Sequence, residues 1–387
     1  MKIILNNTFS LQNWRPNQKE ILNATLSGRD VFVVMRTGGG KSLCYQLPAL
    51  LKKGITLEAG GDDEGDGLLV VFVTPEKVSK SKLFMAALDK TAKKRRLARV
   101  VIDEAHCCSQ WGHDFRPEYR KLGILKRQFS HVPVLAMTAT CTDFLRQDVM
   151  NILNLNSGDT LHFKGSFNRP NLVYQVMDKP EVAKDAMGLL ASFIQENYRG
   201  KAGIVYTFSR REASEVSAGL KKAGVRAASY HAGQEDRDRS NVQQAWMEGV
   251  IDVVVATIAF GMGINHLEVR FVVHFSLSKS IENYYQESGR AGRDGKESRC
   301  VVLYKPSDVS RQATLSCQDQ GSQPLRTLYK MVAYCQTLSI CRRQLIAEAL
   351  GEQAVAGLCN RGCDVCAGNV EDNTEVDATA HADTLIR

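Results

Sequence analysis

The stretch VFVVMRTGGGKSLCYQLP, residues 31–48, constrains the fold of this chain more than any other. Its first five residues, Val31–Met35, are apolar, rich in β-branched side chains and without polar alternation, which predicts a buried parallel strand. A glycine-rich loop follows, and Lys41-Ser42 then precedes an apolar segment of helical length. A strand, a glycine-rich loop and a helix in this order are the context of a phosphate-binding loop.

The loop has the features that phosphate binding requires. Glycines have no Cβ, so successive N–H groups can turn toward phosphate oxygens. Lys41 would then reach the β- and γ-phosphates of ATP, and the Ser42 hydroxyl would ligate Mg²⁺. Met35 stands where the usual pattern has its first glycine, and a plain glycine-rich turn is the alternative. The loop residues are Thr37, Gly38, Gly39 and Gly40.

A second motif lies at the end of another strand-like run, Val100–Ile102, which leads into Asp103-Glu104-Ala105-His106. At the end of a parallel strand, Asp103 would hold the water shell of Mg²⁺, and Glu104 would orient or activate the attacking water. An Asp-Glu pair after a strand is usually only the start of a helix. This pair lies 62 residues after Lys41 and is followed by Ala-His, which favours a nucleotide-hydrolysing site.

Strand-like and helical segments alternate along most of the chain, which predicts an α/β fold with parallel sheets. The segments form two series, joined near FNRPN at residues 167–171, where the proline favours an extended crossing. After Pro306 only helical segments follow. We predict domains over residues 1–166 and 167–308, a small subdomain over 309–366 and a disordered acidic tail over 367–387. The expected strands are 31–35, 68–73, 99–102, 132–137, 203–207, 227–230, 251–256, 270–275 and 300–304.

Charge and cysteine content bear on the partners of the chain. The formal net charge is +8, and residues 367–387 carry five acids against one base, a balance of −4 that leaves +12 on residues 1–366. This excess suits a polyanionic partner. The eleven cysteines are an odd number, and seven are scattered through expected core segments, which favours a reducing compartment. No apolar run is long enough for a transmembrane helix, so no membrane partner is expected.

Six stretches occur in the order seen in RecQ-family DNA helicases, and residues from about 9 to 366 resemble that family. The resemblance implies two RecA-like P-loop NTPase domains with ATP in their cleft, followed by a helical zinc-binding subdomain. It also implies an ATP-dependent helicase that moves 3′ to 5′ on DNA in recombination, repair and replication, with single-stranded and duplex DNA as partners. Its place would be the nucleus in a eukaryote, and otherwise the cytoplasm with the chromosome. The stretches are FSLQNWRPNQ, TGGGKSLCYQLPAL, VIDEAHCCSQWGHDFRPEY, AMTAT, VVVATIAFGMGIN and YYQESGRAGRDG.

The resemblance assigns site residues in these stretches. Arg15 and Gln18 would bind the adenine, and Thr257 would contact DNA. Arg290 and Arg293 would face the phosphate loop across the cleft, with Arg293 as the arginine finger on the γ-phosphate. The aromatic-rich loop after the acidic motif would stack on single-strand bases and bind a phosphate. The loop residues are Trp111, His113, Phe115 and Arg116.

Four cysteines near the end of the chain have metal-ligand spacing, C-x17-C-x3-C-x2-C. Soft ligands spaced in this way suit tetrahedral Zn²⁺, and the resemblance assigns them to the zinc-binding subdomain of the family. Cys335 is a rival by count but does not match the family position, and unligated core cysteines are the alternative. The predicted ligands are Cys341, Cys359, Cys363 and Cys366.

One segment departs from the family pattern. After the phosphate-loop helix, RecQ proteins continue through a strand into a Ser-Pro-Leu motif and a helix that help to grip the DNA backbone. Here Gly54–Leu57 begins that strand, the acidic, glycine-rich segment Glu58–Gly67 follows, and the family pattern resumes at Leu68. An acidic segment repels phosphate, and we expect the shortened sheet to lack hydrogen-bonding partners.

This departure leaves alternatives to an active DNA helicase. If the missing segment is essential, the chain is a nucleic-acid-binding ATPase with weak or no unwinding, as in a degenerate paralogue or a shortened gene product. An RNA helicase of the DEAH type is a further alternative, which the aromatic-rich loop and the four cysteines disfavour. No protein partner is indicated.

Overall fold

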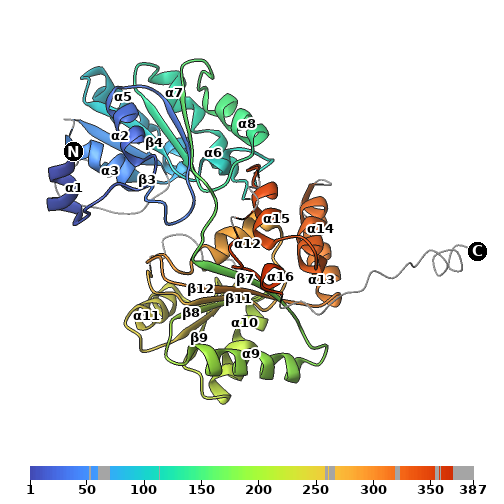
Figure 1. Cartoon of the computed structure of the whole chain (residues 1–387). Coiled ribbons are helices and arrows are strands. Elements are labelled where there is room, and N and C mark those ends of the chain that lie inside the picture. Colours follow the sequence, from blue (N-terminus) through green and yellow to red (C-terminus); the bar gives the residue numbers. More distant parts are fainter. Residues whose placement is uncertain are drawn as a thin grey trace, which may run out of the picture.

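The computed structural model describes residues 1–51, 54–59, 70–112, 114–257, 260, 266–318, 323–353, 357 and 359–368. Within these ranges the chain forms two lobes, each built around a parallel β-sheet, and a C-terminal group of helices packs where the lobes meet (Figure 1). This arrangement is the predicted α/β class. The exact domain boundaries remain predictions.

The first lobe contains a six-stranded sheet in the order β3-β2-β4-β5-β1-β6, in which every pairing is parallel. β1 lies between β5 and β6 and is buried along its length, as its unbroken apolar run predicts. β6 was not among the expected strands, because it is a half-exposed edge strand without a clear apolar run. The strands are β1 (Val31–Val34), β2 (Ile55–Ala59), β3 (Val70–Val73), β4 (Leu97–Ile102), β5 (Val134–Thr138) and β6 (Leu161–Lys164).

Helices cover both faces of this sheet. On one face, Ile21 of α2 and Tyr45 of α3 pack in a cluster with Val31 and Val33 of β1. The other face, which includes Phe32, is covered by α4, α5, α7 and α8. The helices are α1 (Lys2–Phe9), α2 (Gln18–Leu26), α3 (Leu43–Leu51), α4 (Pro75–Lys80), α5 (Lys82–Lys93), α6 (Pro117–Arg120), α7 (Gly123–Gln128) and α8 (Asp143–Leu153), with a 3₁₀ turn η1 (Ala105–Cys108).

The second lobe repeats this plan with a parallel sheet in the order β7-β12-β11-β8-β10-β9. α9 and α10 pack on one face, and Trp246 of α11 and Tyr284 of α12 pack on the other. β7, which was not predicted, forms the edge of the sheet. The elements are β7 (Leu172–Asp178), α9 (Ala183–Tyr198), β8 (Gly203–Tyr206), α10 (Arg210–Lys222), β9 (Ala227–Tyr230), α11 (Asp236–Met247), β10 (Val253–Ala256), β11 (Phe271–His274), α12 (Ile281–Ser288) and β12 (Ser298–Tyr304).

Four helices complete the described chain, and one of them, α16, begins against the second sheet. Tyr174 of β7 forms a parallel bridge with Cys363, and its N–H donates to the carbonyl of Gly362 at 3.2 Å. None of the described helices is long and apolar enough to cross a membrane. The predicted tail lies almost entirely outside the described residues. The helices are α13 (Ser307–Gln318), α14 (Gln323–Gln336), α15 (Arg342–Ala349) and α16 (Asp364–Ala367).

The strand that precedes the acidic segment has two neighbours. β2 pairs in parallel register with β4 on one side and β3 on the other. The expectation that the shortened sheet lacks hydrogen-bonding partners is therefore wrong for β2, because β3 takes the place beside it. Most of the acidic segment Glu58–Gly67 lies outside the described residues.

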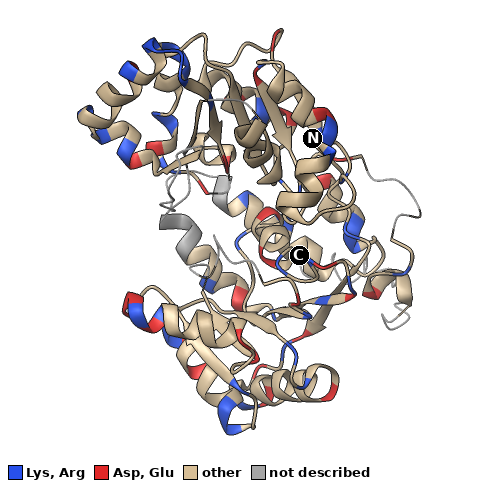
Figure 2. Ribbon diagram, turned by 90° about the vertical axis from the view of Figure 1, so that its left-hand side faces the viewer, with Lys and Arg blue, Asp and Glu red and all other residues tan. Residues whose placement is uncertain are grey.

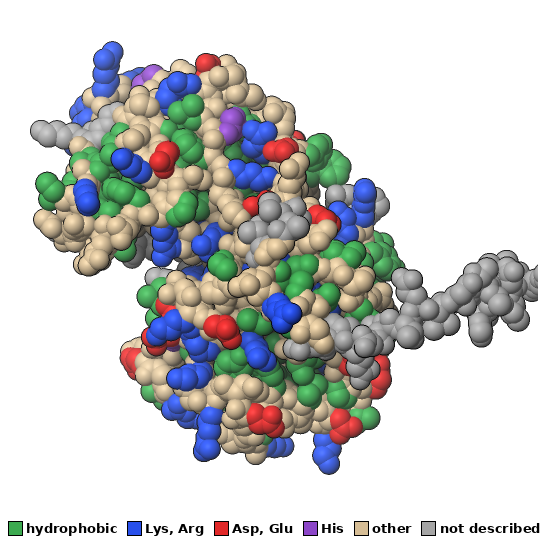
Figure 3. Space-filling view, viewed as in Figure 1, with side chains coloured by type: hydrophobic (Ala, Val, Ile, Leu, Met, Phe, Trp, Pro, Cys, Tyr) green, Lys and Arg blue, Asp and Glu red, His purple; other side chains and the backbone are tan. Residues whose placement is uncertain are grey.

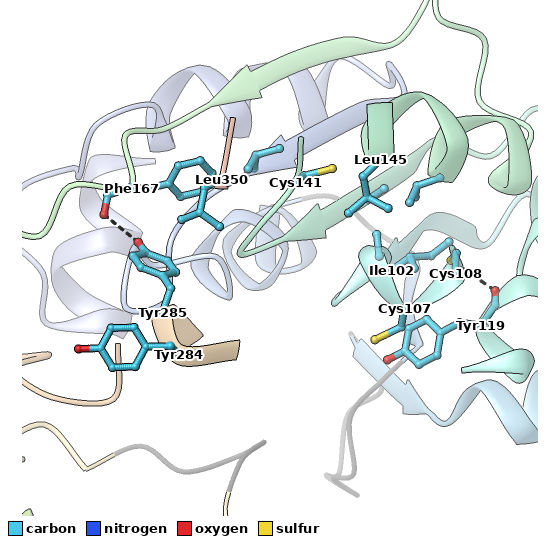
Figure 4. Packing of buried hydrophobic residues seen from close by; sticks show 14 of the residues in the cluster. Ile102, Cys107, Cys108, Tyr119, Cys141, Leu145, Phe167, Tyr284, Tyr285 and Leu350 are labelled. Carbon is cyan, nitrogen blue, oxygen red and sulfur yellow. Dashed lines mark hydrogen bonds between the residues drawn. The ribbon is translucent and has the colours of Figure 1, made fainter. Parts of the chain in front are cut away.

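One hydrophobic cluster joins the two lobes and the C-terminal helices. Figure 4 shows Leu350, just after α15, lying between Cys141 of the first lobe and Phe167 of the linker that joins the lobes, residues 167–171. Tyr285 of α12 points toward the linker, and its hydroxyl donates to the carbonyl of Phe167 at 2.8 Å. Shared burial of these side chains favours a fixed arrangement of the three parts.

Candidate functional site

The glycine-rich loop adopts a conformation that larger residues would resist. Gly38 and Gly40 have φ values of +74° and +89°, in the left-handed region that favours glycine. A Cβ on Gly39 would lie 2.8 Å from the carbonyl oxygen of Arg36, which is too close for any side chain. α3 begins at Leu43, immediately after the Lys41-Ser42 pair. The backbone between β1 and α3 therefore turns as a phosphate-binding loop does.

Arg15, just before α2, and Gln18, its first residue, hold this loop. The side-chain amide of Gln18 donates to the carbonyl of Gly40 at 3.2 Å, and the guanidinium of Arg15 donates to the carbonyl of Gly38. The backbone N–H of Arg15 donates to the Gln18 side-chain oxygen at 2.8 Å. Both residues thus lie at the loop, as a nucleotide-contacting pair must. Their predicted contact with adenine stays a prediction.

The acidic motif lies beside the same loop. Asp103 and Glu104 follow β4, and the Nζ of Lys41 is 4.0 Å from Oε1 of Glu104. Burial raises the pKa of Asp103, and the charge of Lys41 acts in the opposite direction. Glu104 has a φ of +48°, which turns the chain sharply as it leaves the strand. The lysine and the carboxylates predicted to act on one nucleotide therefore lie together.

His106 links the acidic motif to the neighbouring strand. Its Nδ1 lies 2.8 Å from Oγ1 of Thr138 at the end of β5 and 3.4 Å from Oε2 of Glu104. The Thr138 hydroxyl also accepts a hydrogen bond from the N–H of Thr140 at 3.3 Å. A shift of the end of β4 or β5 would therefore change the position of Glu104 through these hydrogen bonds.

The second lobe presents an arginine at the phosphate loop. A Cβ on Gly38 would lie 3.7 Å from Cγ of Arg293, and a Cβ on Gly289 would lie 3.7 Å from Cβ of Thr37. Burial, followed by the charges of Arg290 and Arg169, lowers the pKa of Arg293 to about 10. Arg290 lies instead against Tyr206, where its charge opposes the burial that raises the pKa of that phenol to about 12.

Five arginines converge on this cleft from three parts of the chain. Burial, and then the charge of Arg169, lowers the pKa of Arg36. Lys and Arg side chains are visible where the lobes meet in Figure 3, whereas basic and acidic residues alternate on the outer helices in Figure 2. Converging positive charge favours a polyanion such as a nucleotide triphosphate. The five are Arg15, Arg36, Arg169, Arg290 and Arg293.

The aromatic-rich loop exposes one ring and holds it firmly. Trp111 is 53% exposed and forms an edge-to-face pair with Phe144 of α8, which is 65% exposed, at a centroid distance of 5.7 Å. The backbone N–H of Trp111 donates to Oγ of Ser109, and this hydroxyl donates to Oδ2 of Asp148 of α8 at 2.5 Å. This anchorage fixes the loop to α8.

The other predicted DNA contacts differ in position. Phe115 is half-buried, and Arg116 forms an ion pair with Asp114 at 3.1 Å. Thr257 is half-buried after β10, and its carbonyl accepts from the N–H of Phe260 at 3.1 Å. His113 lies outside the described residues, as do residues 258, 259 and 261–265 directly after Thr257. The DNA contacts of these residues remain predictions.

The four predicted cysteine ligands form a cluster whose sulfur atoms all lie within 4.8 Å of one another. Tetrahedral zinc with Zn–S bonds of about 2.3 Å requires sulfur separations of about 3.8 Å, and the Sγ atoms of Cys341 and Cys363 are 4.0 Å apart. Burial disfavours the Cys341 thiolate, but hydrogen bonds from the N–H of Gln344, the Cys359 thiol, the N–H of Arg343 and the Cys366 thiol together outweigh it and lower the pKa of Cys341. The donor set fits zinc. Cys335 is buried on α14 and does not belong to the cluster.

Two side chains near these sites were not predicted. Phe144 carries no motif, and only its position on the helix after Thr140 could have suggested a partner for Trp111. Arg169 lies in the linker, where the sequence indicated only an extended crossing, yet its side chain is buried. It is bonded to the segment between α12 and β12, residues 289–297, which carries Arg290 and Arg293 and is the arginine loop of this protein. A buried contact between residues 120 positions apart leaves no periodic signal.

Three family profiles match the sequence. The DEAD/DEAH box helicase profile matches residues 15–78 and 56–147, the helicase conserved C-terminal domain matches 184–295, and the RecQ zinc-binding profile matches 306–367. The two ranges that match the first profile overlap at residues 56–78. This double match lies at the departure noted in the sequence.

Solved structures of low identity share the fold. The chain superposes on Dbp5 of S. cerevisiae bound to RNA and ADP BeF3 with a TM-score of 0.61 and 15% identity, over 86% of this chain and 90% of that one. Helicase Lhr of Mycobacterium smegmatis, bound to ssDNA and AMP-PNP, gives 0.62 and 17% identity, over 89% of this chain and 54% of that one.

Curated relatives are much closer in sequence. ATP-dependent DNA helicase Q1 of Rattus norvegicus is 43% identical over 425 positions, covering 100% of this chain and 68% of the relative. Because this chain has 387 residues, at least 38 of those positions are filled only in the relative. ATP-dependent DNA helicase Q-like 2 of Arabidopsis thaliana is 44% identical over 93% of this chain and 56% of its own length, and the chain spans 65% of the mouse Q1 protein. The motif order, the paired parallel sheets, the four-cysteine cluster and these identities establish that the chain belongs to the RecQ family of helicases.

Proposed function

We propose that this protein is a DNA-stimulated ATPase that uses hydrolysis to move along single-stranded DNA and separate duplexes. The observation that carries the proposal is the meeting of Lys41, Glu104 and Arg293 around one glycine-rich loop, with the arginine contributed by the second lobe. Two lobes that share one nucleotide must move relative to each other when its γ-phosphate is lost.

Each side chain has a distinct role in the proposed reaction. Lys41 binds the β- and γ-phosphates, and Glu104 orients the attacking water. Arg293 stabilises the charge of the transferring phosphoryl group, with Arg290 beside it. Arg15 and Gln18 bind the adenine. Ser42 and Asp103 would hold Mg²⁺, which would neutralise charge on the phosphate oxygens.

Zinc has a structural role in this proposal. The four cysteines would hold it in a tetrahedral site with no open position, where it would stabilise the fold of the C-terminal helices and take no part in hydrolysis. The resemblance to the RecQ family implies 3′-to-5′ movement, participation in recombination, repair and replication, and a nuclear location, and we include these properties in the proposal.

A tailed-duplex assay tests the function directly. The protein is expected to displace a strand from a duplex with a 3′ single-stranded tail, to act poorly on the matched 5′-tailed duplex, and to require ATP. ATPase stimulation by DNA and RNA oligomers of one sequence tests the substrate class. Stronger stimulation by RNA would favour the DEAH-type RNA helicase instead.

A second candidate is an ATPase that binds DNA but unwinds it weakly. It is favoured by the double match of residues 56–78 and by the positions that only the relative fills. Grafting the relative's segment between Leu57 and Leu68 should then increase both DNA-stimulated ATPase and unwinding. If the parental chain already unwinds as fast as the grafted one, the segment is dispensable and the weak-unwinding candidate is excluded.

A further inference from the structure

The linker between the lobes grips the arginine loop through one buried side chain. Arg169 is 3% exposed, and its guanidinium donates to three backbone carbonyls at 3.0, 2.8 and 2.6 Å. The planar guanidinium suits this task, because its donors point in fixed directions toward several acceptors at once. The three carbonyls belong to Gly289, Ala291 and Gly292, which flank Arg290 and lead to Arg293.

A second linker residue holds the far side of the same loop. The side-chain amide of Asn171 donates to the carbonyls of Gly292 and Lys296, both at 2.9 Å. The backbone carbonyl of Asn171 accepts from the N–H of Ser298 at 2.9 Å. The backbone on both sides of Arg293 is therefore fixed to the linker.

The linker is itself held by the C-terminal helices. Arg343 of α15 is 8% exposed, and its guanidinium donates to Oδ1 of Asn168 and to the carbonyl of Arg169, both at 2.7 Å. It also donates to the carbonyls of Pro170 and Leu172. A continuous set of hydrogen bonds thus runs from α15 through the linker to the arginine loop.

The charges in this region explain why such anchoring is useful. The positive charges of Arg169, Arg290 and Arg293 oppose one another, so other contacts must keep the backbone around Arg290 and Arg293 in place. Arg169 is bonded to carbonyl oxygens, which are dipoles without net charge. The loop therefore keeps its positive charge for a nucleotide while its backbone stays in place.

We propose that Arg169 is a positioning residue that holds Arg293 at the phosphate loop, and that Arg343 makes this position depend on the zinc-binding subdomain. The proposal deepens the proposed function and rests on it, because the position of Arg293 matters only if a nucleotide binds between the lobes. Arg169 itself makes no contact with the reacting atoms in this scheme.

The test compares Arg169→Met and Arg343→Met with the matched control Arg342→Met. Arg342 is the neighbour of Arg343 on α15 and is 1% exposed, but it bonds Asp364 within its own subdomain at 2.9 Å. Hydrogen exchange at the amides of Gly289–Gly292 reports loop opening, because these amides donate to backbone carbonyls of the second lobe. ATP turnover, the KM for ATP and the melting temperature are measured on the same full-length proteins.

We expect Arg169→Met and Arg343→Met to speed exchange in the loop. Arg169→Met should lower kcat by on the order of 10²-fold, since a displacement of about 1 Å is enough for such a loss, with a much smaller change in KM. Arg169→Lys retains the positive charge and an ammonium donor group but not the planar guanidinium, and it should lose less. Arg342→Met should lower the melting temperature without changing loop exchange or kcat.

A double substitution separates positioning from general damage. In an Arg293→Ala background, Arg169→Met should lower kcat further by less than about twofold, because the side chain that Arg169 positions is already absent. A purely structural role for Arg169 would instead give multiplicative losses. Should Arg169→Met fail to fold, Arg169→Lys and Asn171→Ala supply the same comparison.

The outcomes distinguish this proposal from the proposed function. Unchanged loop exchange in Arg169→Met and Asn171→Ala overturns the positioning proposal, whether or not ATP is hydrolysed. Equal effects of Arg342→Met and Arg343→Met on the loop overturn the link to the zinc-binding subdomain. Absence of ATP turnover in the parental protein, with a loop that opens in Arg169→Met, overturns the proposed function alone.

Discussion

Arg99 of β4 lies opposite Thr56 of β2 in the parallel register, and within the described part of the chain neither polar side chain has a hydrogen-bond partner. Arg99 is 1% exposed and Thr56 is fully buried. Burial lowers the pKa of Arg99 to about 10. Buried guanidinium groups are normally paired, because an uncompensated charge in the interior is costly. Thr56 belongs to β2, after which this chain departs from the RecQ pattern, and Arg99 belongs to the neighbouring strand β4.

Replacing this arginine should stabilise the protein. Arg99→Met removes the buried charge and keeps much of the apolar volume, so the free energy of unfolding should rise by about 1–4 kcal/mol. Urea denaturation at neutral pH measures the change. Arg99→Lys retains a buried charge and should give no comparable gain. A loss of stability in Arg99→Met would show that the guanidinium has a partner in solution.

The same charge predicts a pH dependence. The pKa of Arg99 in the folded chain, about 10, is lower than its ordinary value of 12.5. Above about pH 10 the unfolded chain therefore binds more protons at this residue, and the parental protein gains stability as the pH rises. The stability gap between Arg99→Met and the parental protein should stay constant below about pH 9 and narrow as the pH rises above about 10. A gap that does not narrow would contradict the assignment.

Removal of Arg293, the arginine that the second lobe presents to the phosphate loop, should nearly abolish ATP turnover. Arg293→Ala should lower ATP hydrolysis by on the order of 10³-fold or more, as loss of an arginine finger does. The melting temperature should change little, because the side chain faces the cleft. Arg311→Ala, which removes an exposed arginine of α13, is the control. Hydrolysis at the parental rate in Arg293→Ala would rule out the cleft as the hydrolytic site.

The exposed ring pair should bind single-strand bases. Base stacking on an aromatic side chain is worth about 1–3 kcal/mol, so Trp111→Ala and Phe144→Ala should each weaken stimulation of the ATPase by single-stranded DNA. Basal hydrolysis without DNA should persist in both. Leu83→Ala removes a side chain that is 84% exposed on α5 and serves as the control. Full stimulation in Phe144→Ala would show that this ring only supports the loop.

Zinc should copurify with the protein. Elemental analysis is expected to find one zinc per chain in protein prepared without chelator, because the four sulfur atoms already lie within 4.8 Å of one another and suit zinc. Cys363→Ser should lower the zinc content and the melting temperature together, since metal binding stabilises so small a subdomain. Cys335→Ser, outside the cluster, should retain the metal. Zinc-free protein with an unchanged melting temperature would contradict the site.

Sequence reasoning predicted the elements that have a strong local pattern. The apolar run at Val31 gave β1 to within one residue, and the run at Ala227 gave β9 with both ends correct. The four cysteines were predicted as a cluster because their spacing is itself the signal. β7 escaped prediction, since it is a sheet edge whose outer half is only partly buried.

The parts that escaped prediction depend on contacts between distant residues. Arg169 was not predicted at all, and for Gln18, a predicted adenine contact, the bond to the carbonyl of Gly40 was not predicted. No periodicity marks a side chain whose partner is a distant carbonyl. The neighbours of β2 were also predicted wrongly, because loss of a sequence segment does not reveal which remaining strand takes its place. Local patterns specify elements, whereas their neighbours are selected by the packing of the whole chain.

The bridge between Tyr174 and Cys363 also determines when the second lobe can be completed during synthesis. β7 is one of the first segments of that lobe to leave the ribosome, but the residues that cover its outer edge, Gly362 and Asp364, follow almost two hundred positions later. At about 5–20 residues per second, this interval lasts roughly 10–40 s. Throughout that time the nascent chain carries an uncovered strand edge, which is open to mispairing. The final residues of the zinc-binding subdomain therefore act as a late closing step for a sheet that begins in the middle of the protein.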